Sequence, residues 1–157
     1  AASLARDGVR IADIGTDHAY LPIYLYLSGR ASGGVVSDIN QGPVDRARAN
    51  LCDYGCESVF VAQRADGLSG VLDYWIDDIF ILGMGGELIA EILEKGKTPD
   101  YYNINFILNP MTRDDDLRRY LLENGFKIEG EEAVEQSGKV YTVILCILFC
   151  NRATRIK

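Results

Sequence analysis

Short apolar runs and longer amphipathic segments alternate along most of the chain. Val9–Ile14 is an apolar run with β-branched residues, long enough for a buried strand and too short for a helix. Similar runs predict further strands at 35–40, 58–62, 78–82 and 105–108. Between them, helical spacing and turn residues predict helices that begin near Pro22, open at Gly42 and Pro43, and cover 87–95. The alternation is typical of β/α units around a parallel sheet.

The end of the chain has a different pattern. Thr112-x-x-Asp115 resembles a capping box and predicts a helix that Gly125 ends. The runs 126–135 and 139–150 are strand-like, and Gln136-Ser137-Gly138 between them predicts a hairpin. A plain dinucleotide fold would end in another crossover helix, whereas class I S-adenosylmethionine-dependent methyltransferases end in such a hairpin. We therefore predict one Rossmann-like α/β domain over 1–157, with a mostly parallel seven-stranded sheet that ends in an antiparallel hairpin.

Composition narrows the function classes. No apolar run approaches the ~20 residues that span a bilayer, and no signal-peptide pattern precedes the first strand, so we expect a cytoplasmic protein without a membrane partner. The chain begins without Met and almost at that strand, so we expect upstream residues to be missing. The net charge of −7 argues against a large basic face for nucleic acid.

The four cysteines form two C-x-x-x-C pairs, Cys52 with Cys56 in one predicted helix and Cys146 with Cys150 in one predicted strand. This is not the usual C-x-x-C spacing of a metal site, and the single histidine, His18, is far away in the sequence. We expect buried free thiols and no metal.

The turn after the first strand indicates which nucleotide the fold holds. Asp13 ends the strand, and Gly15 allows a sharp turn, but Asp17 stands where a dinucleotide fingerprint needs its second glycine. A carboxylate about 4 Å from a phosphate costs on the order of 4 kcal/mol at an effective dielectric near 20, which disfavours NAD and ATP. S-adenosylmethionine has no phosphate and carries positive groups. The alternative interpretation is that Asp17 caps the following helix.

Polar residues also follow the other predicted strands. Asp38 lies where such folds place an acid on the ribose hydroxyls, and Asp66 with Gly67 lies where methyltransferases contact the adenine amino group. Gly83-Met84-Gly85-Gly86 would face the donated methyl group, and Met84 is a candidate for lining a base pocket. Alternatively, these acids and glycines are ordinary turn residues.

Asn109-Pro110-Met111 invites comparison with the Asn-Pro-Pro-aromatic motif of amino-group DNA methyltransferases. That motif follows the fourth strand, whereas this one follows the fifth. We therefore do not infer amino-group methylation from this motif. Asn109 is still a candidate residue of the cleft.

Taken together, the chain resembles the bacterial tRNA methyltransferases that modify N1 of adenine 22 in the D-arm. The similarity rests on the blocks at 13–22, 37–43, 66–67, 83–86, 110–118, 123–126 and 138–141. Asn109 stands where the family leads us to expect Gln. The family also continues into a helical C-terminal region thought to help hold tRNA, so the resemblance implies that this chain is the catalytic domain alone.

The resemblance implies S-adenosylmethionine as cofactor, tRNA as partner and methyl transfer to adenine N1 as the reaction. The candidate catalytic residues are Asp17, which would stabilise the cationic product base, His18 as a proton acceptor or base contact, Tyr20 as a stacking platform, and Met84. The expected cofactor-binding residues are Asp13, Gly15, Thr16, Asp17, His18, Leu21, Pro22, Asp38, Ile39, Asn40, Asp66, Gly67, Gly83, Met84 and Gly85.

Three alternatives remain open at this point. One is a small-molecule methyltransferase with the same donor, and another is a non-catalytic S-adenosylmethionine-binding domain. The third, an NAD-dependent enzyme, is disfavoured by Asp17. A basic cluster of Arg113, Arg118 and Arg119 is interleaved with Asp114–Asp116, so we interpret it as a solvated helix face.

Overall fold

The computed structural model describes residues 1–96, 101, 103–136 and 138–149. One seven-stranded sheet runs through the domain in the order β3-β2-β1-β4-β5-β7-β6. The strands are β1 (Val9–Ile14), β2 (Ala31–Asp38), β3 (Phe60–Arg64), β4 (Asp78–Gly85), β5 (Asn105–Thr112), β6 (Phe126–Gln136) and β7 (Lys139–Leu148). The first five pair in parallel, and β7 pairs antiparallel with both β5 and β6. The predicted sheet and its closing hairpin are confirmed.

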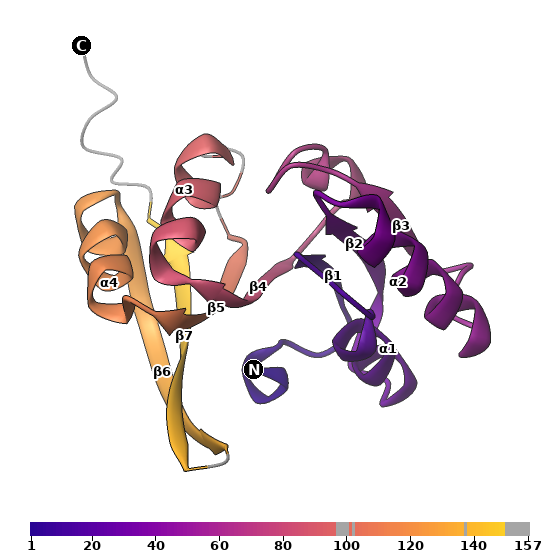
Figure 1. Cartoon of the computed structure of the whole chain (residues 1–157), viewed down its shortest axis with the longest axis horizontal. Coiled ribbons are helices and arrows are strands. Elements are labelled where there is room, and N and C mark those ends of the chain that lie inside the picture. Colours follow the sequence, from indigo (N-terminus) through magenta and orange to yellow (C-terminus); the bar gives the residue numbers. More distant parts are fainter. Residues whose placement is uncertain (97–100, 102, 137, 150–157) are drawn as a thin grey trace.

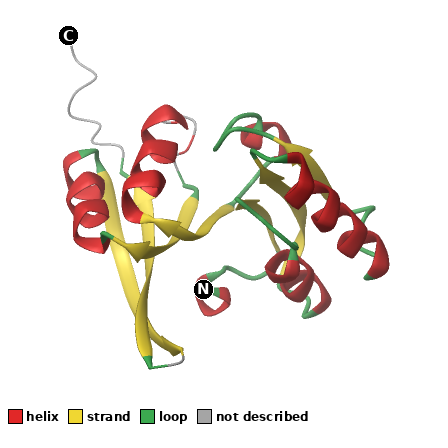
Figure 2. Ribbon diagram, viewed as in Figure 1, coloured by secondary structure: helices red, strands yellow, loops and turns green. Residues whose placement is uncertain are grey.

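Helices cover the sheet on two sides. They are α1 (Tyr20–Leu27), α2 (Gln41–Asp53), α3 (Gly86–Gly96) and α4 (Asp114–Glu123), with short 3₁₀ turns η1 (Ala2–Leu4) and η2 (Val71–Tyr74). Figure 1 shows α1 and α2 beside β1–β3, and α3 and α4 beside β5–β7. Figure 2 shows the strands passing between these two groups. Within the described residues, no helix has both the length and the apolar character needed to span a bilayer.

Each face of the sheet has its own apolar core. Ile14, Ile81 and Leu108 belong to the core that includes α3 and α4, whereas Ile11, Phe80 and Ile107 belong to the core that includes α1 and α2. The alternation follows from the two-residue period of a strand. The sheet is therefore packed on both faces, and its carboxyl edge carries the turns that the sequence singled out.

Several predicted boundaries were wrong. β2 covers Ala31–Asp38, so it begins four residues earlier than the predicted strand 35–40 and ends two residues earlier. Its glycines permit this, because a Cβ on Gly34 would overlap the Ile11 carbonyl oxygen of β1. β3 lies two residues later than predicted. α1 begins at Tyr20, so Pro22 lies in the first turn, where backbone N–H groups have no intrahelical acceptor.

The predicted capping box is also wrong. β5 extends four residues beyond the predicted end, so Thr112 pairs with Gly85 in the sheet. α4 starts at Asp114, and its N-cap residue, Arg113, makes no side-chain capping bond. Asp114–Asp116 occupy the first turn, where carboxylates interact favourably with the helix dipole. Ser137 of the predicted hairpin turn, Cys150 and the tail 151–157 lie outside the described residues.

Candidate functional site

A pocket opens where β1, β2 and β4 end. Parallel strands present their carboxyl ends at one edge, and ligands of open α/β sheets bind at that edge. Six of the expected site residues line this pocket, namely Gly15, Asp38, Ile39, Asp66, Gly67 and Met84. They come from stretches up to about 70 residues apart, so their convergence is a property of the fold.

Four further residues of the pocket escaped the sequence analysis: Ile14, Ala65, Leu88 and Ile92. Leu88 and Ile92 are one turn apart on α3, and their helical spacing indicated only an apolar helix face. In the structure, Leu88 is 47% exposed and Ile92 is 8% exposed. The part of the helix face that contains these two residues borders the pocket. The walls are thus mainly apolar, with carboxylates at Asp38 and Asp66.

The two loops that follow β2 and β3 are held together. Asp38 Oδ1 accepts a hydrogen bond from the Asn40 backbone N–H at 2.7 Å. Arg64, the last residue of β3, donates from Nε to the Ile39 carbonyl oxygen at 2.9 Å. These bonds fix Ile39 and the Asp38 carboxylate at the edge of the pocket.

The turn after β1 is tied to β2. The backbone N–H groups of Gly15 and Thr16 both donate to the Ser37 carbonyl oxygen, at 2.8 and 3.0 Å. Thr16 Oγ1 accepts the Ala19 N–H at 3.1 Å, just before α1. These bonds connect the turn to β2 and to the start of α1.

Asp13 lies beneath this turn and is 8% exposed. Burial raises the pKa of its carboxyl to about 6, although a hydrogen bond with Thr16 opposes the shift. A buried carboxyl with this pKa changes its ionisation near neutrality, and such groups cluster at functional sites.

Asp17 does not cap α1, because the N-cap of that helix is Ala19 and no side-chain capping bond forms. Its Oδ1 instead accepts hydrogen bonds from the Arg46 guanidinium of α2, including one from Nε at 2.9 Å. Its Oδ2 lies 3.1 Å from His18 Nε2. Hydrogen bonding to Arg46 lowers the pKa of Asp17, so this exposed carboxylate is ionised at neutral pH.

His18 and Tyr20 form an exposed aromatic pair beside Asp17. Their rings stack with centroids 5.1 Å apart and planes 8° from parallel. The Tyr20 residue is 60% exposed. Asp17 and His18 lie in the turn after β1, and Tyr20 is the first residue of α1. These three residues do not line the pocket, and neither do Asp13, Thr16, Leu21, Pro22, Asn40, Gly83 and Gly85.

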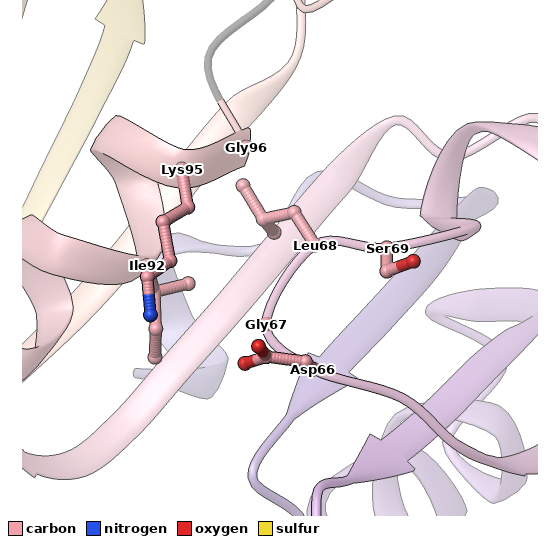
Figure 3. A pocket seen from close by; sticks show the side chains of 7 residues that line it. All are labelled: Asp66, Gly67, Leu68, Ser69, Ile92, Lys95 and Gly96. Atoms are coloured by element: carbon pink, nitrogen blue, oxygen red, sulfur yellow. The ribbon is translucent and has the colours of Figure 1, made fainter.

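A second hollow adjoins the pocket at Asp66, Gly67 and Ile92, which line both. Figure 3 shows the Lys95 side chain extending from α3 on one side of this hollow, with Asp66 on the loop opposite. The Lys95 ammonium pairs with Glu91 at 2.8 Å. This contact, and then the charge of Asp66, raises the pKa of Lys95.

None of the cysteines that the structure describes lines this pocket. Cys56 and Cys146 are buried as expected, but Cys52 is exposed, and Cys56 follows α2 instead of lying in it. Over the ranges that the structure describes, no group of three or more His, Cys, Asp or Glu side chains could hold a metal ion.

Comparisons with known proteins connect this geometry to a chemistry. A family model described as a methyltransferase domain matches residues 1–144. The chain is 37% identical over 139 residues to the tRNA (adenine(22)-N(1))-methyltransferase of Bacillus subtilis, a match that covers 88% of this chain and 58% of that protein.

Two solved structures were obtained with the donor or its product. Streptococcus pneumoniae Sp1610, in complex with S-adenosyl-L-methionine, superimposes with a TM-score of 0.88 at 35% identity, over 94% of this chain and 70% of that one. M. capricolum TrmK, in complex with S-adenosyl-homocysteine, gives a TM-score of 0.82 at 32% identity, over 94% of this chain and 65% of that one.

Proposed function

Because this chain belongs to the methyltransferase-domain family and, within it, to the TrmK-type tRNA (m1A22) methyltransferases, we propose that it methylates N1 of adenine 22 in tRNA with S-adenosylmethionine as donor. The chain spans 58% of the length of the B. subtilis relative. The observation that carries the proposal is the pocket at the carboxyl edge, where Asp38, Asp66 and Met84 meet between apolar walls.

The pocket residues fit the adenosine part of the donor. Ile39, Leu88 and Ile92 offer apolar surface to a flat purine. The Asp38 carboxylate accepts ribose hydroxyl donors, and Asp66 is an acceptor for the adenine amino group. We assign the other expected residues around the turn, Asp13, Thr16, Leu21, Pro22, Asn40, Gly83 and Gly85, to the amino-acid end of the donor and to the support of these loops.

When bound, the donor supplies an electrophilic methyl group on a sulfonium. Neutral adenine keeps a lone pair on N1, so the residues of this chain need mainly to orient the base and to stabilise the positive charge that it gains. We assign the second task to Asp17, which is ionised, and a contact with the base to the stacked His18 and Tyr20. Met84 borders the cofactor pocket at the end of β4 and would contact the reacting groups.

The tRNA partner requires positive charge that this acidic chain, with a net charge of −7, does not supply in bulk. We propose that the part of the relatives that this chain does not span contributes tight tRNA binding. We also propose a cytoplasmic location, because the proposed substrate is tRNA.

Methyl transfer from labelled S-adenosylmethionine to unmodified bacterial tRNA tests the proposal, with mass spectrometry to identify the product nucleoside. This chain and a version with its natural C-terminal continuation are assayed side by side, and Asp38→Ala serves as a variant with a damaged pocket. We expect N1-methyladenosine, with a lower KM for tRNA in the longer version. Donor binding without any tRNA product in both versions would overturn the proposal and favour a small-molecule acceptor or a non-catalytic role.

A further inference from the structure

A separate pocket lies at the same edge of the sheet. Its lining comes from β4, β5, β6 and β7, and none of its residues lines the cofactor pocket. The walls are Leu82, Met111, Val134, Tyr141 and Val143, with the amide of Asn109 as a polar group and Ala1 as a further neighbour.

Strand pairing brings these residues together. Leu82 of β4 is the register partner of Asn109 of β5, and Val134 of β6 is the partner of Tyr141 of β7. β7 runs antiparallel to β5, so the hairpin end of β7 lies beside the carboxyl end of β5. The antiparallel ending of the sheet thus builds one side of the pocket.

The separate pocket and the cofactor pocket meet the same short stretch of β4. Leu82 lines the former, and Met84 lines the latter. Between them, Gly83 carries no side chain, and among the described residues no atom lies within 4 Å of the position that a Cβ would take. β4 therefore places no side chain between the two pockets at Gly83.

Asn109 has a fixed orientation in this pocket. Its Nδ2 donates to the Thr142 carbonyl oxygen at 2.9 Å, and a carbonyl can only accept, so the other end of the amide is the acceptor Oδ1. Within the described part of the chain, no donor is recorded on that oxygen. A mainly apolar pocket that carries the Asn109 amide oxygen as an acceptor, with the Tyr141 hydroxyl as a second polar group, suits a flat, uncharged heterocycle that carries an amino group.

We propose that this pocket holds the adenine to be methylated, with Asn109 Oδ1 accepting a hydrogen bond from the exocyclic amino group. The inference rests on the function proposed above. The amino group is attached to C6, next to N1, so this bond would orient N1 relative to the cofactor pocket. Guanine carries a carbonyl oxygen at that position, which Oδ1 would repel, so Asn109 is a specificity-determining residue.

The test pairs a change in the protein with a change in the RNA. Wild type and Asn109→Ala are assayed on tRNA with either adenosine or purine riboside, which lacks the amino group, at the target position. For each protein, the ratio of kcat/KM with adenosine to kcat/KM with purine riboside is measured. This ratio should be about ten times larger in wild type than in Asn109→Ala, which corresponds to one lost hydrogen bond. The lower intrinsic reactivity of purine N1 affects both proteins and cancels when the two ratios are compared.

Two further variants test whether an effect of Asn109→Ala could come from a general disturbance of the structure. Asn105→Ala removes the same amide at the opposite end of β5 and should leave the ratio unchanged. Met111 is 43% exposed, so Met111→Ala should fold; it should raise the KM for tRNA and keep the calorimetric affinity for S-adenosylmethionine. Melting temperature and donor affinity are measured for every variant.

The outcomes separate the two proposals. A wild-type protein that makes no N1-methyladenosine, either as this chain or with its natural C-terminal continuation, would overturn the proposed function and this inference with it. A wild-type protein that methylates tRNA, with the same adenosine-to-purine ratio in Asn109→Ala, would overturn only the assignment of this pocket. A normal KM for tRNA in Met111→Ala would count against that assignment as well.

Discussion

Gly15 packs directly against the tip of the Met84 side chain, and both residues line the pocket at the carboxyl edge of the sheet. A Cβ on Gly15 would overlap Cε of Met84, and Gly15 also has a φ of +75°. The missing side chain at position 15 thus leaves room for the Met84 side chain at the end of β4, although the two residues are 69 positions apart in the sequence.

Gly15→Ala should weaken binding of S-adenosylmethionine. The left-handed backbone costs an alanine roughly 1–2 kcal/mol, and the new methyl group pushes the flexible Met84 side chain toward the pocket. Calorimetry measures the donor affinity. The double variant Gly15→Ala with Met84→Ala should recover part of the affinity, because it removes the overlap and keeps the strain. Equal affinities in the single and double variants would show that the overlap does not matter.

Asp13→Asn should stabilise the domain at neutral pH. The folded-state pKa of about 6 lies above the ordinary value of 3.8, so ionisation of Asp13 destabilises the folded state. Its contribution therefore lowers the free energy of unfolding progressively as pH rises from about 4 to 6. Two pKa units correspond to roughly 3 kcal/mol as an upper limit. Denaturant unfolding at several pH values measures the difference between variant and wild type. This difference should be small near pH 4 and level off above pH 7; a constant difference would contradict the burial argument.

Asp17→Asn should lower kcat for tRNA methylation by roughly tenfold or more and leave the melting temperature nearly unchanged. Asp17 is exposed, so its role in the proposal is electrostatic and acts on the charge that the base acquires. The matched control is Asp45→Asn, which removes another exposed carboxylate paired with an arginine, Arg48 of α2. Steady-state kinetics compare the two variants, and equal kcat values would remove Asp17 from the mechanism.

Gly86→Ala should destabilise the fold by about 1–3 kcal/mol. A Cβ on Gly86 would overlap the Arg113 carbonyl oxygen, and backbone cannot give way as a side-chain tip does. Gly130→Ala is the control, because a Cβ there would meet nothing within 4 Å. Thermal unfolding measures both, and similar melting temperatures would show that α3 and α4 can move apart at low cost.

Much of the candidate site could be predicted from the sequence, because turn residues after strands mark the carboxyl edge of a parallel sheet. Gly15, Asp38, Asp66 and Met84 were identified in this way, and all four line the pocket at the carboxyl edge. Leu88 and Ile92 were not, because helical spacing identifies an apolar face without saying which part of it borders a ligand.

The sequence by itself determined the order and type of the elements, since the two-residue and 3.6-residue periods, together with Gly and Pro, act over a few neighbouring residues. Only the tertiary structure decided where β2 begins and β5 ends, since strand length depends on the partner strands. It also decided that Asp17 pairs with Arg46 instead of capping α1, and that Leu82, Asn109 and Tyr141 share a pocket. These contacts join residues far apart in the chain, and their energies arise only when packing brings the side chains together.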